Sequence, residues 1–146
     1  MKKKIRDKND SFGYLTSRAG STIMKSMREQ LKHAGVEMPP EQMEILFYLW
    51  EKDGQNQKEL NEGHFKNKAT ITRGISSLEK YNLVIRVTDE KDKRNRKVYL
   101  THKGKELETI VKSIAYQTQN NAIKGISKRD LETCKKVLNK IYENLK

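Results

Sequence analysis

The residue types that most often carry catalysis or bind metals are few in this sequence and widely spaced. Its three histidines, His33, His64 and His102, fall on different expected elements, and none stands in a zinc-binding spacing such as HExxH. The single cysteine, Cys134, excludes the usual CxxC zinc clusters, and no glycine-rich phosphate loop is present. We therefore predict that the protein is not an enzyme and has no cofactor or metal. An enzyme whose site is assembled from scattered acidic residues is the disfavoured alternative.

Basic side chains are the abundant chemical group. Lys and Arg number 31 against 19 Asp and Glu, a net charge of +12. Such an excess favours an anionic partner, with nucleic acid or a membrane surface before other acidic ligands. The densest charge run is DEKDKRNRK at residues 89–97, in which eight of nine residues are charged. Taken alone, a run of this kind is usually a solvated hairpin tip.

The elements that would position these basic residues are mostly helical. A chain of 146 residues fits one domain, and its hydrophobic share of 34% favours an elongated helical protein that completes its core by dimerising. Apolar residues at helical spacing predict a long helix over 11–34 and a second one after the two prolines at 39–40. They also predict a helix ending near residue 120 and a narrow apolar seam over 131–145.

A short helix, a turn and a second helix are predicted between residues 56 and 82. Asn56 and Glu59 have the spacing of a capping box, and the second helix begins near Asn67. A helix-turn-helix presents the start of its second helix to base edges in the major groove, where Arg suits guanine, Asn suits adenine and a Thr methyl suits thymine. An ordinary amphipathic helix explains this segment alone about as well. The predicted DNA-binding residues here are Lys66, Asn67, Lys68, Thr70, Thr72, Arg73 and Ser76.

The charged run favours the helix-turn-helix over an ordinary amphipathic helix, because two strand-like segments, 83–88 and 97–101, flank it. Residues 86–105 hold eight Lys and Arg against three acidic residues, a net charge of +5. A helix-turn-helix followed by a charged hairpin is a winged helix, whose hairpin can reach phosphates or the minor groove. We therefore predict that the run is a DNA-contacting wing, with Arg96 among its DNA-binding residues.

Four segments resemble successive signatures of the MarR-type transcriptional regulators: PPEQMEILFYLW, QKELNEGHF, KATITRGISSLEKYNLVIR and DKRNRKVYLTHKGKEL. The resemblance covers roughly residues 12–145 and is most specific in the wing. It implies that Arg94 reaches DNA, that Asp92 braces the wing and that residues 68–73 begin the recognition helix. It also implies a homodimer built from a single domain over 1–146, in which 1–36 and 101–146 form dimerisation helices and 37–100 form the winged-helix lobe.

The sequence departs from the family pattern at three places. Pro39 stands where a Thr or Ser helix cap is common, and Tyr81-Asn82 replaces a turn that usually contains Gly. No cysteine lies near the N-terminal helix, which disfavours peroxide sensing. Cys134 lies in the seam of the last helix and is expected to be a buried structural thiol.

Many members of the family bind anionic aromatic compounds and then release DNA, so the resemblance implies a small anionic aromatic ligand. Phe12, Tyr14, Trp50 and Tyr116 could line a cavity for it. Because a core position is the commoner meaning of each aromatic residue, no ligand-binding residue is predicted.

Together these observations predict a mostly α protein, a winged helix-turn-helix with long N- and C-terminal dimerisation helices. We expect it to bind double-stranded DNA at a pseudo-palindromic operator as a homodimer and to repress transcription, which is the usual mode of the family. The lack of a membrane-length apolar run and the single cysteine predict a cytoplasmic protein with no membrane partner. The alternative is a winged-helix RNA-binding or protein-interaction module. RNA recognition relies on exposed aromatic stacking, and Tyr99 is the one aromatic residue between 83 and 101.

Overall fold

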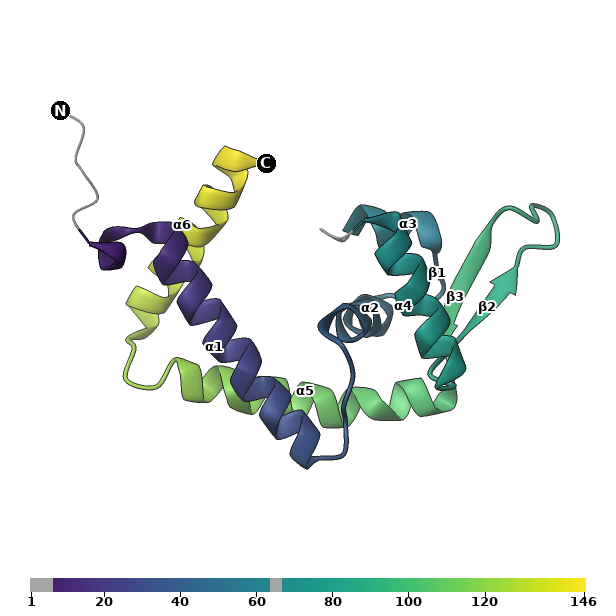
Figure 1. Cartoon of the computed structure of the whole chain (residues 1–146), viewed down its shortest axis with the longest axis horizontal. Helices are drawn as coiled ribbons and strands as arrows, with labels where there is room; N and C mark the ends of the chain where they lie inside the picture. Colours follow the sequence, from purple (N-terminus) through teal and green to yellow (C-terminus); the bar gives the residue numbers. More distant parts are fainter. Residues whose placement is uncertain (1–6, 64–66) are drawn as a thin grey trace. The chain divides into compact units, whose positions relative to one another are not determined.

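A computed structural model describes residues 7–63 and 67–146, which form six α-helices, one short 3-10 helix and three strands. The predicted order of four helices, a hairpin and two helices is confirmed, as is the mostly α winged helix-turn-helix (Figure 1). The elements are the 3-10 helix Lys8–Asp10, α1 (Phe12–His33), α2 (Pro40–Glu51), β1 (Gln55–Asn56), α3 (Gln57–Gly63), α4 (Lys68–Lys80), β2 (Val84–Thr88), β3 (Arg96–Leu100), α5 (His102–Ala122) and α6 (Lys128–Leu145).

The chain divides into two compact units. The winged-helix unit comprises Leu31–Ser113, and the helical unit comprises the chain up to Gln30 together with Ile114–Lys146. The winged-helix unit contains the predicted lobe of residues 37–100 and extends beyond it on both sides. The assignment of the remaining helices to dimerisation stays a prediction.

The core of the winged-helix unit lies between α2, α3, α4 and the sheet. The inner face of α4 consists of Ile71, Ile75 and Leu78, which are each fully buried. Burial of this face leaves the opposite line of the helix exposed at Ala69, Arg73, Ser76 and Lys80. The other fully buried side chains of this unit include Ile45, Leu46, Leu49, Leu60, Val84, Val98 and Val111.

The sheet is antiparallel with the order β1-β3-β2, so β3 lies between the other two strands. The hairpin pairs Val84 with Leu100 at its base and Thr88 with Arg96 toward its tip. The tip lies at the free end of the hairpin (Figure 1). The sequence did not predict β1, a two-residue strand that pairs Gln55 with Val98. β1 attaches the start of α3 to the wing.

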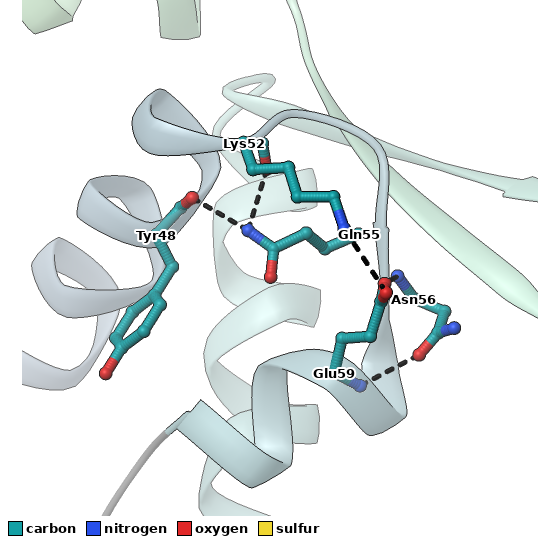
Figure 2. Close-up of polar contacts among 5 residues, drawn as sticks. All are labelled: Tyr48, Lys52, Gln55, Asn56 and Glu59. Carbon is teal, nitrogen blue, oxygen red and sulfur yellow. Dashed lines mark hydrogen bonds and ion pairs between the residues drawn. The ribbon is translucent and has the colours of Figure 1, made fainter.

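The junction between α2 and α3 is held by side chains that satisfy helix ends (Figure 2). The predicted capping box is confirmed: Asn56 N–H donates to Glu59 Oε2 and Glu59 N–H donates to Asn56 Oδ1, both at 2.8 Å. The buried amide of Gln55 donates to the carbonyl oxygens of Tyr48 (2.8 Å) and Lys52 (2.7 Å) at the end of α2. One short segment therefore ends α2, joins the sheet and starts α3.

The connection from the hairpin into α5 depends on a glycine. A Cβ at Gly104 would collide with the backbone oxygen of Leu83, so only glycine allows this approach. The carbonyl oxygen of Gly104 also accepts a 2.9 Å hydrogen bond from the buried Trp50 indole. Asn82, which stands in a turn where the family usually has Gly, has a φ of 59°, in the left-handed region that Asn tolerates.

The helical unit buries little apolar surface in the single chain. Met27 is 7% exposed, and Gln30 Nε2 donates to Thr118 Oγ1 at 2.9 Å. None of the residues of α6 is buried, and Leu138 and Leu145 are 46% and 83% exposed. The expected burial of Cys134 is wrong for the single chain, where this residue is exposed, as are Leu138 and Leu145 of the same seam.

Pro39 precedes α2 without a side-chain cap, as its residue type dictates, and Pro40 occupies the first helical position. Across residues 7–63 and 67–146, no helix combines the length and apolar character needed to cross a membrane.

Candidate nucleic-acid interface

A hollow of about 670 Å³ lies in the winged-helix unit where α3, the start of α4 and the wing meet. Among the described residues that line it, four are basic, namely Lys58, Lys68, Arg94 and Arg96, and Asp92 is the one that is acidic. We call it the basic hollow. Its remaining lining residues are the polar Asn56, Gln57, Asn61 and Asn95.

The start of α4 is held by Asn67, whose side chain caps the helix. Asn67 Oδ1 accepts hydrogen bonds from Thr70 N–H at 2.9 Å and from Thr70 Oγ1 at 3.0 Å. The positive end of the helix dipole therefore lies beside Lys68 at the edge of the basic hollow, an arrangement that favours a phosphate. Asn67 serves as a helix cap here, which leaves its predicted contact with DNA untested.

The predicted reading residues of α4 differ in what they already contact. Arg73 is exposed on the outward line of the helix, and its Nη2 donates a long 3.4 Å bond to Thr70 Oγ1. Thr72 Oγ1 instead donates to the Lys68 carbonyl oxygen at 2.8 Å and accepts from Gln57 Nε2. Ser76 Oγ donates to the Thr72 carbonyl oxygen at 3.0 Å. Arg73 is therefore better disposed to reach a base edge than Thr72 or Ser76.

The hydrogen bonds of the wing tip explain why its sequence contains acidic residues among the basic ones. Asp92 Oδ1 accepts the Arg94 N–H at 3.0 Å, and Asp89 Oδ1 accepts the Lys91 N–H at 2.9 Å. Backbone bonds from Asp89 N–H to the Asn95 oxygen and from Asn95 N–H to the Asp92 oxygen close the turn. The two aspartates thus shape the backbone, while the Arg94 side chain lines the basic hollow.

The structure brings together some of the predicted residues. Lys68, Asp92, Arg94 and Arg96 line the basic hollow, whereas Thr70, Thr72, Arg73 and Ser76 lie on α4 outside its lining. Lys66 and His64 fall outside the described residues, so the structure says nothing of the predicted role of Lys66.

Sequence reasoning missed the contribution of α3 to this surface. Gln57, Lys58 and Asn61 of α3 line the basic hollow together with Asn56 of β1. Asn61 Oδ1 is buried there without a hydrogen-bond partner. The signal that could have found them is the polar face of the first helix of a helix-turn-helix, which crosses the DNA backbone in that motif.

The electrostatics of this region are simple. The pKa of Glu59 lies below its ordinary value because its carboxylate accepts the Asn56 backbone N–H; Lys52, with Nζ 3.5 Å away, adds a smaller effect. Desolvation opposes this shift without reversing it. Within the part of the chain that the structure describes, no three His, Cys, Asp or Glu residues gather in a way that could hold a metal ion.

The fold and the basic hollow define a winged helix-turn-helix protein. The family model described as MarR family matches residues 38–95. The HTH-type transcriptional regulator SarZ of Staphylococcus epidermidis is 33% identical over 76 residues, which cover 52% of this chain and 51% of SarZ. The chain thus spans about half the length of the curated SarZ relatives from this species that it matches.

Solved structures match over nearly the whole chain. A MarR transcriptional regulator from Methanosarcina mazei Go1 is 29% identical, with a TM-score of 0.78, and the match covers 90% of this chain and 94% of that one. The transcriptional repressor CouR, solved on a 23-mer DNA duplex, has a TM-score of 0.83 at 20% identity over 97% of this chain and 99% of CouR, which shows the shared fold. The predicted resemblance to the MarR family is confirmed by the family model over residues 38–95.

Proposed function

We propose that this protein is a transcriptional regulator that binds specific sequences of double-stranded DNA through α4 and the wing. The basic hollow carries this proposal. Three elements separated in the sequence place Lys58, Lys68, Arg94 and Arg96 around one hollow beside a helix N-terminus. Cations around the positive end of a helix suit the DNA backbone, while the neighbouring outward line of α4 offers Arg73 to base edges.

The comparisons support the same function. SarZ is described as a transcriptional regulator, and CouR is a repressor whose structure contains a DNA duplex. The part of this chain that matches the family model includes α4 and the wing tip. Regulation by DNA binding, rather than catalysis, is therefore the function that we propose.

We further propose that the protein acts as a homodimeric repressor on a pseudo-palindromic operator. α6 leaves its apolar residues open in the single chain, where Leu138 is 46% and Tyr142 is 49% exposed. A second copy with the same seam would cover them, and a two-fold symmetric dimer requires a two-fold symmetric site. Half-site centres would then lie about one DNA turn, roughly 10 bp, apart.

Selection of bound sequences from random duplex DNA tests this function. We expect a two-fold symmetric consensus sequence. We also expect the fraction of this DNA that is bound to fall steeply as the salt concentration increases. Enrichment without any consensus would contradict sequence-specific regulation. A parallel selection from single-stranded RNA tests the alternative, and a stronger enrichment there would favour the RNA-binding module.

A second cavity, of about 410 Å³, suits a small-molecule effector. It lies within the winged-helix unit between the connection from α1 to α2, the end of α4 and the start of α5. Its lining includes the apolar Val36, Met38, Leu83, Leu107 and Ile110, the aromatic Tyr81, and the charged Glu37, Lys103 and Glu106. Two carboxylates against one ammonium favour a neutral or cationic amphiphile over the anionic aromatic class that the family resemblance implies.

The four aromatic residues considered from the sequence lie elsewhere. Trp50 is buried and bonded to Gly104, Phe12 and Tyr116 are 71% and 70% exposed, and Tyr14 lies beneath Lys8 and Arg18. Calorimetry with matched anionic, neutral and cationic aromatic compounds would identify the class that binds. Loss of that binding in Ile110→Asp, together with release of DNA by the compound, would place an effector in this cavity.

A further inference from the structure

Arg86 is a basic residue at the base of the wing that the structure turns away from solvent. Its side chain is only 16% exposed, in contrast to Arg94 and Arg96, which are exposed and line the basic hollow. Arg86 belongs to the same basic segment of residues 86–105, but it is not among the residues predicted to bind DNA. Its environment in the structure points to another role.

The guanidinium of Arg86 contacts two turns of α4 at once. Nη1 lies 3.1 Å from Glu79 Oε1, while Nη2 donates to Ser76 Oγ at 3.0 Å and to the Thr72 carbonyl oxygen at 3.3 Å. The Arg86 backbone N–H adds a 3.2 Å bond to Glu79 Oε2. Thr72, Ser76 and Glu79 share one side of α4 at spacings of four and three residues. We call this set of contacts the Arg86 brace.

The Arg86 brace joins the two parts that the proposed function requires to act together. Arg86 belongs to β2 and pairs with Val98 of β3, two residues from Arg96. The wing tip at Asp92 is six residues further along, a distance of up to about 20 Å in extended chain. A tilt of about 10° at the brace would move the tip by roughly 3 Å over that length, which exceeds the tolerance of a hydrogen bond.

We propose that Arg86 is a positioning residue that fixes the recognition helix α4 against the wing, so that Arg73 and Arg94 engage one DNA site simultaneously. It does so from inside the fold and does not contact DNA. The guanidinium of arginine offers a planar fork of donors that lysine lacks. In Arg86 these donors bind the Thr72 carbonyl oxygen, the Ser76 hydroxyl and the Glu79 carboxylate. This inference rests on the proposed function of DNA binding.

A matched pair of variants separates positioning from phosphate contact. Arg86→Gln and Arg94→Gln each remove one positive charge. For Arg94→Gln we expect the log–log slope of affinity against salt to fall by about 0.9, as for one lost phosphate contact. For Arg86→Gln we expect the slope to stay unchanged while affinity for the selected site falls on the order of tenfold, since hydrogen bonds to a charged group are lost. Arg86→Lys should restore little of the lost affinity.

Glu79 provides the opposite test of charge. Glu79→Gln makes the protein more positive, so simple attraction to DNA would strengthen binding, whereas loss of the brace should weaken it. The double variant Arg86→Gln with Glu79→Gln should bind about as weakly as Arg86→Gln alone, because both changes break one set of contacts.

Hydrogen exchange without DNA tests the brace independently of the function. The Arg86 backbone N–H should exchange faster in Glu79→Gln than in the wild type, with global stability checked by thermal melting. A slope reduced by about 0.9 in Arg86→Gln would show a phosphate contact and overturn the proposal. Retained affinity in Arg86→Gln would also overturn it. A wild type that selects no DNA sequence would refute the proposed function, while the exchange measurement would still report on the brace.

Discussion

At the wing tip, single aspartates shape the backbone while their basic neighbours remain available to DNA. Asp92 Oδ1 accepts the Arg94 N–H at 3.0 Å, so this carboxylate fixes the shape of the tip through a backbone hydrogen bond. Asp92→Ala should therefore weaken DNA binding although it adds net positive charge. Asp92→Asn is the matched control, because Asn retains the acceptor and should preserve affinity. Tighter binding by Asp92→Ala in a titration would show that net charge dominates.

Specificity is also a property of single residues. Arg73→Ala should cost on the order of 1–3 kcal/mol on the selected site and much less on unrelated DNA, if the guanidinium reads a base edge. Thr70→Ala tests the half-buried hydroxyl in the first turn of α4 in the same way. Lys80 lies on the same exposed line at the far end of the helix, so Lys80→Ala serves as the control. An equal loss on both DNAs would assign Arg73 to phosphates or to the fold.

At the scale of elements, the capping box determines how firmly α3 is held beneath the basic hollow. Asn56→Ala removes the Oδ1 that accepts the Glu59 N–H and should lower the free energy of unfolding by about 1 kcal/mol. Asn56→Asp keeps an acceptor and should cost less. Chemical denaturation of both variants measures the difference, and equal stabilities would show that the cap contributes little.

Glu59 gives the same box a predictable pH dependence. Its pKa in the folded protein lies below its ordinary value, chiefly because the carboxylate accepts the Asn56 N–H. Its contribution to stability is therefore complete above the unfolded pKa of about 4.3 and is lost as the pH falls through the lower folded pKa. Glu59→Gln mimics the protonated carboxyl. The stability difference between wild type and Glu59→Gln should shrink as melting is measured from pH 6 down to pH 3, and a constant difference would contradict this assignment.

For the whole molecule, the decisive feature is the apolar surface that one chain leaves open on α6. Sedimentation at micromolar concentration should show a stable dimer, because Leu138 and its neighbours along the seam need a covering partner. Leu138→Glu should weaken dimerisation and DNA binding together, while Lys136→Glu, off the seam, should leave the dimer intact. A species of only 17.1 kDa would contradict the dimer.

The local features of this protein could be predicted from the sequence because their causes lie within a few residues. Helical apolar spacing predicted α1, α2, α4, α5 and α6, and the strand-like segments on either side of the charged run predicted the hairpin. The Asn56–Glu59 capping box and the left-handed Asn82 depend on neighbours at most four residues away. Each of these features can therefore be predicted from the neighbouring residues in the sequence.

Only the tertiary structure decided which charges meet. Lys58, Lys68 and Arg94 converge because α3, α4 and the wing pack on one core, and Arg86 points inward because packing places it beside Glu79. The two-residue strand β1 likewise depends on pairing with β3 from more than 40 residues away. A basic residue in the sequence has the same identity whether it contacts DNA or braces a helix. Its role is set by the neighbours that desolvate it and bind it, and those neighbours come from other segments of the chain.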